Sequence, residues 1–185
     1  MQGVIFNALE EFVIDLGGME LWNKVLESAD VPSGGIYTFG ETYDDQEIVD
    51  LAAHLCDAID VELAKGLNLF GRFLFGYLLA RGNVQIKDYN NTQALLSELE
   101  DVIHKDVKRL HPGAYTPFFE YQPVDQEKGT LIYRSKRKLC QVAEGLVQGA
   151  AENYGQDVLF QHTHCMHQDA EECRWNLQFS KKDVE

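Results

Sequence analysis

The chain has 185 residues, of which 45% are hydrophobic and 11% aromatic, and its formal net charge is −14. This size suits one domain with a sizeable core, so we expect a single domain over residues 1–185. The negative charge repels nucleic acids and anionic lipids, which argues against either as a partner. No apolar run reaches the ~20 residues that cross a bilayer. Because the start lacks a signal-peptide pattern, a cytoplasmic protein is expected.

The first part of the chain has the periodicity of helices. Hydrophobic residues recur at three- and four-residue steps over 4–16, which predicts a helix ended by Gly17-Gly18. Similar patterns predict further helices, which cover 19–29, a stretch starting at 48, 61–80 and 92–110. Pro112-Gly113 ends the last of these. The helical part is therefore expected over about residues 1–112.

The pattern changes after Pro117. Four segments have the composition of strands, namely 118–124, 130–135, 157–163 and 174–179. In the last of them Trp175, Leu177 and Phe179 alternate with polar residues, which is a period of two. A helix is predicted between the second and third strands. We therefore expect an α+β fold, in which an antiparallel sheet of about four strands, carrying one helix, covers about 113–185.

His104 lies at the margin of the apolar stripe on its predicted helix. Leu96, Leu99, Ile103 and Val107 form that stripe, with about 100° between successive residues. A histidine at such a margin can face a pocket beside the core and act as an axial metal ligand. A half-exposed surface histidine has the same spacing, so the helix alone leaves both interpretations open.

Tyr133, Ser135 and Arg137 are spaced to point the same way from an extended chain. Two hydroxyls and one guanidinium suit a carboxylate, because arginine binds it as a fork and the hydroxyls satisfy its other lone pairs. A haem propionate is such a carboxylate. The same alternation also occurs on exposed sheet faces, so the pattern by itself is not specific.

Three cysteines and one histidine have a spacing that suits tetrahedral zinc. These residues are Cys140, His162, Cys165 and Cys173. His164 and His167 are rival ligands, and three unrelated cysteines are the alternative reading. Cys56 lies in a helical pattern with no partner, so it is expected in the core.

The Tyr-x-Ser-x-Arg pattern, about 29 residues after a histidine on an apolar helix, resembles the haem-nitric oxide/oxygen binding (H-NOX) domain family. The resemblance covers essentially the whole chain. It begins with Met-Gln-Gly-Val-Ile-Phe, continues through Asp-Val-Ile-His at 101–104 and ends with His-Thr-His-Cys-Met-His at 162–167.

The resemblance implies a haem b buried between the helical and sheet parts, and it implies roles for residues of this chain. His104 matches the iron ligand, and Tyr133, Ser135 and Arg137 match the residues that hold the propionates. Pro117 matches a proline that distorts the haem. In a bacterial subgroup, zinc is held at the positions matched by Cys140, His162, Cys165 and Cys173.

The resemblance also points to the gas. Oxygen-binding members carry a tyrosine nine residues past the first propionate-binding residue, and here that position is Val142. Dioxygen gains from a hydrogen-bond donor, whereas nitric oxide binds ferrous haem strongly without one. We therefore expect nitric oxide and carbon monoxide to bind and dioxygen to be excluded. The expected apolar wall consists of Ile5, Leu9, Leu74, Val142 and Leu146.

The implied function is that of a bacterial nitric oxide sensor without enzymatic activity. Nitric oxide would weaken or break the bond between His104 and the iron, and the change would regulate a separate partner. By resemblance the partner is a histidine kinase of a two-component system or a cyclic-di-GMP synthase or phosphodiesterase. A zinc-stabilised, haem-free interaction module that binds an apolar ligand is the alternative. A haem peroxidase is a third reading, against which the apolar wall argues.

Overall fold

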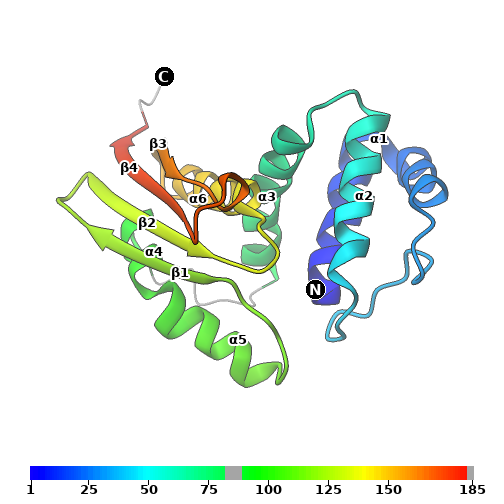
Figure 1. The fold of residues 1–185 in the computed structure, drawn as a ribbon, viewed down its shortest axis with the longest axis horizontal. Helices are drawn as coiled ribbons and strands as arrows, with labels where there is room; N and C mark the ends of the chain where they lie inside the picture. The colour runs from blue at the N-terminus through cyan, green and yellow to red at the C-terminus, as the bar shows by residue number, and fades with distance from the viewer. Residues whose placement is uncertain (82–88, 183–185) are drawn as a thin grey trace.

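The computed structural model describes residues 1–81 and 89–182. Its helices are α1 (Gly3–Ala29), α2 (Asp45–Ala58), α3 (Leu63–Ala80), α4 (Thr92–Glu98), a π-helix (Leu99–His104), α5 (Lys105–Leu110), α6 (Cys140–Asn153) and a 3₁₀ helix (Met166–Gln168). Its strands are β1 (Phe118–Pro123), β2 (Lys128–Arg134), β3 (Gln156–His164) and β4 (Cys173–Lys181). Figure 1 shows this α+β architecture, which confirms the expected fold class.

Helices α1 and α2 pack side by side at one end of the molecule (Figure 1). The predicted break at Gly17-Gly18 is present as a kink within α1, where Gly18 has a φ of 71°. Phe6, Leu9 and Leu51 are almost completely buried in the core between the helices. None of the described helices combines the length and hydrophobicity that crossing a membrane requires.

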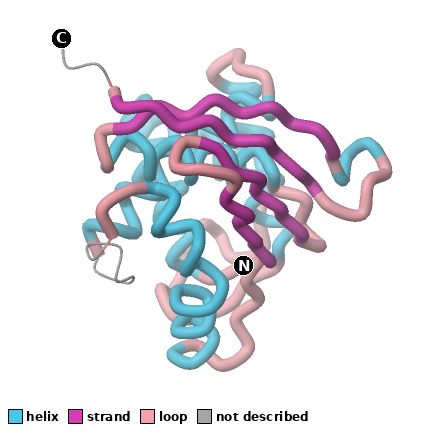
Figure 2. The backbone as a smooth tube through the Cα atoms, turned by 90° about the vertical axis from the view of Figure 1, so that its left-hand side faces the viewer, coloured by secondary structure: helices cyan, strands magenta, loops and turns pink. Residues whose placement is uncertain are grey.

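The four strands form one antiparallel sheet in the order β1-β2-β4-β3, which Figure 2 shows as a continuous layer. The period of two in β4 has the expected consequence, because Trp175, Leu177 and Phe179 are buried while the residues between them face away. Leu96 from α4 and Val147 from α6 belong to the same hydrophobic cluster as these strand residues. The sheet therefore has one covered face and one solvent-facing side.

Helices α3 and α6 cross at very close range, and glycines make this possible. A Cβ atom on Gly145 would collide with the carbonyl oxygen of Asn68, and one on Gly71 would collide with that of Val142. A Cβ atom added to Gly149 would lie 2.7 Å from the carbonyl oxygen of Arg72, which is also too close. Glycines on both helices therefore let α3 and α6 pack at close range.

The single helix expected over 92–110 is divided into three segments. α4 and α5 are ordinary α-helices, but the segment between them, Leu99–His104, is wound as a π-helix. In space, α4 and the π-helix pack against β1 rather than against α1 and α2. His104, the last residue of the π-helix, is therefore held by the sheet side of the molecule.

Candidate cofactor site

A cavity of about 450 Å³ lies between the helices and the sheet, within the range typical of small-molecule and cofactor sites. Its walls come from α1, α2, α3, the helical segment 92–110, the end of β2 and α6. Every residue that the sequence linked to haem lines it. These residues are Ile5, Leu9, Leu74, His104, Pro117, Tyr133, Ser135, Arg137, Val142 and Leu146.

One wall of the cavity is apolar. Ile5 and Leu9 reach it from α1, Leu74 from α3, and Val142 and Leu146 from α6. On each helix the residues that line the cavity follow the three- and four-residue spacing of a helical face. The same periodicity that builds the core therefore also builds this wall, whose residues the family resemblance had indicated.

His104 also lines the cavity and is largely buried, with 12% of its side chain exposed. Its Nδ1 lies 2.9 Å from Glu100 Oε2, so the carboxylate accepts a hydrogen bond from that nitrogen. Burial lowers the pKa of His104, although Glu100 opposes this effect. The neutral imidazole that ligates metals is favoured, and Nε2 is the nitrogen left for a metal.

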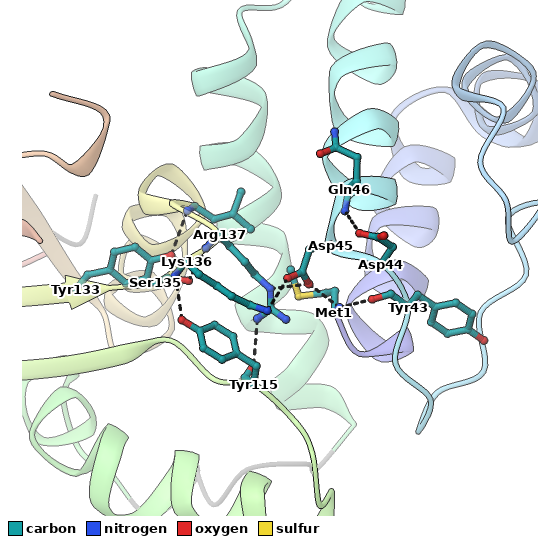
Figure 3. A network of polar contacts seen from close by, with 11 residues as sticks. Met1, Tyr43, Asp44, Asp45, Gln46, Tyr115, Tyr133, Ser135, Lys136 and Arg137 are labelled. Carbon is teal, nitrogen blue, oxygen red and sulfur yellow. Dashed lines mark hydrogen bonds and ion pairs between the residues drawn. The ribbon is translucent and has the colours of Figure 1, made fainter. Parts of the chain in front are cut away.

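Tyr133, Ser135 and Arg137, here called the clamp, meet at the rim of the cavity (Figure 3). Tyr133 is the next-to-last residue of β2, whereas Ser135 and Arg137 lie in the loop that follows, because the strand ends at Arg134. Burial raises the pKa of Tyr133 to about 12, so its hydroxyl keeps its proton. The clamp can thus offer neutral hydroxyl donors and one cation to a carboxylate.

Asp45 holds Arg137 in place, and sequence reasoning missed this contact. Arg137 Nε donates to Asp45 Oδ1 over 2.7 Å, and the Met1 ammonium group lies 2.6 Å from the same oxygen. Lys136 Nζ adds a third cation 3.6 Å from Oδ2. Burial alone would raise the pKa of Asp45, but the ammonium group and Arg137 lower it overall.

The residues present fit a haem. His104 supplies an imidazole whose Nδ1 is paired with Glu100, and the clamp supplies donors for propionates. Thr116 also lines the cavity, and its buried Oγ1 has no hydrogen-bond partner within residues 1–81 and 89–182. A buried hydroxyl without a partner is rare in folded proteins, so this atom is consistent with a polar ligand group beside it.

A second constellation lies on the sheet side of the molecule. The sulfur atoms of Cys140, Cys165 and Cys173 all lie within 4.8 Å of one another, a spacing that could hold a metal ion. Cys140 begins α6, Cys165 follows β3 and Cys173 begins β4, so three separate elements meet here. Burial and the neighbouring thiols raise the pKa of Cys140. Cys56 does not belong to this cluster. It lies in α2 and is buried, as expected for a core residue.

The predicted histidine ligands lie at the edge of this cysteine cluster. His162 is exposed on β3 and its ring stacks on Trp175 with centroids 4.8 Å apart, so it is outside the group of three sulfurs. His164 Nδ1 lies 3.1 Å from Thr163 Oγ1, and His167 Nε2 lies 2.7 Å from the Lys138 carbonyl oxygen. The structure thus brings three of the four predicted zinc ligands together.

Fold and cavity together define a haem-binding sensor domain, and the comparisons with known proteins agree. The Haem-NO-binding family model matches residues 2–162. The chain superimposes on a crystal structure of an H-NOX protein from S. oneidensis in the Fe(II)NO ligation state with a TM-score of 0.91, at 30% identity, over 98% of this chain and 100% of that one. This chain belongs to the Haem-NO-binding (H-NOX) family, whose members are haem-based gas sensors.

Two further relatives are similar to this chain. The solution structure of the IWP-051-bound H-NOX from Shewanella woodyi, in the Fe(II)CO state, matches with a TM-score of 0.82 and 31% identity, covering 100% of this chain and 97% of that one. Soluble guanylate cyclase 89Db of Drosophila melanogaster is 24% identical over 161 residues, or 85% of this chain. The chain spans only 24% of the length of that cyclase.

Proposed function

We propose that this chain is a nitric oxide sensor of the bacterial type, which holds haem b through His104 and regulates a separate partner. The observation that supports this most strongly is the shared cavity. One imidazole, a three-residue clamp and an apolar wall come from segments that are far apart in the sequence, yet all of them line it.

In this proposal His104 Nε2 ligates the iron, and the clamp binds the propionates through two hydroxyls and the Arg137 guanidinium. Pro117 lines the same cavity and would press on the haem and distort it. When bound, ferrous haem supplies the site at which nitric oxide and carbon monoxide attach. The protein residues orient the haem and keep its surroundings dry.

The apolar wall supports the choice of gas. Val142 is buried and occupies the position at which the oxygen-binding members carry a tyrosine hydroxyl. Dioxygen without a hydrogen-bond donor loses stabilisation that nitric oxide does not need. We therefore propose that the sensor responds to nitric oxide, binds carbon monoxide and excludes dioxygen.

The signal in this proposal is the release of His104. Loss of the bond between His104 and the iron would free the π-helix and α5 from the haem, and the surface that they form could then change. A gas can shift this equilibrium only through its preference for one of the two states, so the bond to His104 must differ between them. The proposed reader of that change is a histidine kinase or a cyclic-di-GMP synthase or phosphodiesterase, and the chain itself has no enzymatic role.

We also propose that zinc binds Cys140, Cys165 and Cys173, with His162 as the fourth ligand. The clustered sulfurs support three of these ligands. His162 lies three residues before Cys165, and this spacing is the basis for proposing it as the fourth ligand. Such a site would fasten β3 and β4 to α6 and stabilise the sheet side of the molecule.

Absorption spectroscopy tests the proposed function. The protein reconstituted with haem should give a strong Soret band that moves on adding nitric oxide and stays unchanged under air in the ferrous state. His104→Gly should keep the haem and abolish the dependence of partner activity on the gas, leaving the partner in its signalled state. His54→Gly, which replaces a histidine outside the cavity lining, is the matched control. A protein that takes up no haem would instead support the haem-free module.

A further inference from the structure

Glu100 is the hydrogen-bond partner of the His104 side chain. It lies four residues before His104 on the π-helix, and its Oε2 accepts from His104 Nδ1 over 2.9 Å. Both side chains are shielded, with 12% of His104 and 27% of Glu100 exposed. A hydrogen bond between a carboxylate and an imidazole is strong in such surroundings, because little water competes for it.

Two further contacts fix the Glu100 carboxylate. Lys108 Nζ on α5 lies 3.0 Å from Oε1, and the Phe119 backbone N–H on β1 points to Oε2 at 3.4 Å. The carboxylate is thus anchored from the following helix and from the sheet. Because its position does not depend on His104, it can hold the imidazole in one orientation before any metal binds.

We propose that Glu100 sets the strength of the bond between His104 and the haem iron, and thereby how readily nitric oxide detaches His104. This inference rests on the proposed function. A carboxylate that accepts the Nδ1 proton pulls positive charge towards itself and leaves Nε2 more basic, so the bond from Nε2 to a metal becomes stronger. Glu100 is a positioning residue in this role, since it touches only the ligand.

Lys108 acts in the opposite direction. Its ammonium group shares the same carboxylate, and a cation beside Glu100 withdraws negative charge from the hydrogen bond to His104. Lys108 is half-exposed, so its side chain can be changed with little effect on packing. Glu100 and Lys108 therefore form a pair in which one residue strengthens the bond to the iron and the other weakens it.

The test uses three variants of the haem-loaded protein. Glu100→Gln keeps the shape but removes the charge, and Lys108→Met removes the opposing cation. Asp101→Asn is the matched control, because Asp101 is an exposed carboxylate on the same π-helix. Resonance Raman spectroscopy of the ferrous protein reports the iron–histidine stretching frequency. The ratio of six- to five-coordinate haem under nitric oxide reports how often His104 stays bound.

We expect Glu100→Gln to lower the stretching frequency and to reduce the six- to five-coordinate ratio by about ten-fold or more, the usual effect of losing a partner of a metal-bound histidine. Lys108→Met should move both quantities the other way, and Asp101→Asn should move neither. In the carbon monoxide form, the NMR signal of the His104 Nδ1 proton should shift upfield in Glu100→Gln, as expected for a weaker hydrogen bond.

The outcomes separate this inference from the proposed function. If the unmodified protein shows no iron–histidine band at all, the proposed function fails. If the band is present but has the same frequency in the unmodified protein and in Glu100→Gln, the role of Glu100 is refuted while the sensor proposal stands. Should Glu100→Gln not fold, Lys108→Met decides alone, and an unchanged frequency in that variant overturns the inference.

Discussion

Arg137 donates from Nε to Asp45 Oδ1 over 2.7 Å, across 92 positions of sequence. Arg137 belongs to the loop after β2, whereas Asp45 is the first residue of α2 (Figure 3). The contact therefore ties the two sides of the cavity together at the point where the clamp sits. Arg137 also donates from Nη1 to the Tyr115 carbonyl oxygen at 3.0 Å, which leaves three of its five N–H groups for a ligand.

Asp45→Asn should lower the free energy of unfolding by about 1–3 kcal/mol. Arg137 is 9% exposed and Asp45 is 30% exposed, so the ion pair lies between the buried and the surface cases. Urea denaturation measures the change. Asp44→Asn is the control, because within residues 1–81 and 89–182 Asp44 accepts only from the Gln46 backbone N–H as the N-cap of α2, and asparagine caps equally well. Equal stability of the two variants would show that the ion pair contributes nothing.

The contribution of Asp45 should also depend on pH. The pKa of this carboxyl is lowered from 3.8 in the folded protein, so folding favours its charged form. The stabilisation is then complete above the unfolded pKa and is lost as the pH falls through the lowered folded pKa. Urea titrations should give a constant difference between the unmodified protein and Asp45→Asn from about pH 7 to 5, and a smaller one below about pH 4. A difference that grew on acidification would contradict this sign.

Gly145→Ala should destabilise the protein by about 1–3 kcal/mol or more, because its Cβ would press on the backbone of α3. Gly76→Ala provides the contrast within α3. Gly76 is exposed and no atom lies within 4 Å of an added Cβ, so alanine there should raise stability by about 0.5–1 kcal/mol. Thermal unfolding of both variants measures the two effects. A neutral Gly145→Ala would mean that α3 and α6 can separate without cost.

Val142→Tyr should give the haem-loaded protein a measurable affinity for dioxygen. The added hydroxyl would place a donor at the apolar wall, where dioxygen otherwise finds no such stabilisation. Val142→Phe has the same shape without the hydroxyl and should remain unable to bind dioxygen. Absorption spectra of the ferrous variants under air distinguish the two cases. Binding of dioxygen by both would assign the effect to space rather than to the hydrogen bond.

Cys140→Ser should lose bound zinc, whereas Cys56→Ser should retain it, although both cysteines are buried. Of these two cysteines, Cys140 alone belongs to the group of sulfurs that lie within 4.8 Å of one another in the described part of the chain. A chelator should lower the melting temperature of Cys56→Ser as it does that of the unmodified protein, and should have no such effect on Cys140→Ser, since metal binding contributes to folding. Elemental analysis gives the zinc content. Full occupancy in Cys140→Ser would refute this ligand.

Sequence reasoning located features that depend on local periodicity. The strands with alternating residues, such as Trp175 and Phe179, lie where expected, and so does the kink at Gly17-Gly18. The clamp residues and His104 were also placed at one cavity, because a family pattern relates their spacing. Periodicity contains no information about the bond between Asp45 and Arg137, which depends on how distant segments come together in the fold.

Other features were missed for different physical reasons. The π-helix keeps hydrophobic residues at nearly helical spacing, so Leu99 and Ile103 look the same in either form of winding. The four-residue separation of Glu100 and His104 is visible in the sequence and does predict neighbouring side chains on a helix. It gave no sign that His104 would line a cavity, since charged pairs at that spacing are common on exposed helices.

The π-helix also affects how the rest of its segment should be interpreted. A wide turn accommodates one more residue than an α-turn, which rotates α4 relative to α5 by roughly one residue's angular step, about 100°. A helical wheel drawn through residues 92–110 as one uniform helix would therefore misplace the side-chain directions of α4 by that angle relative to those of α5. Cross-linking or spin-label positions on this segment have to be chosen separately on either side of the wide turn.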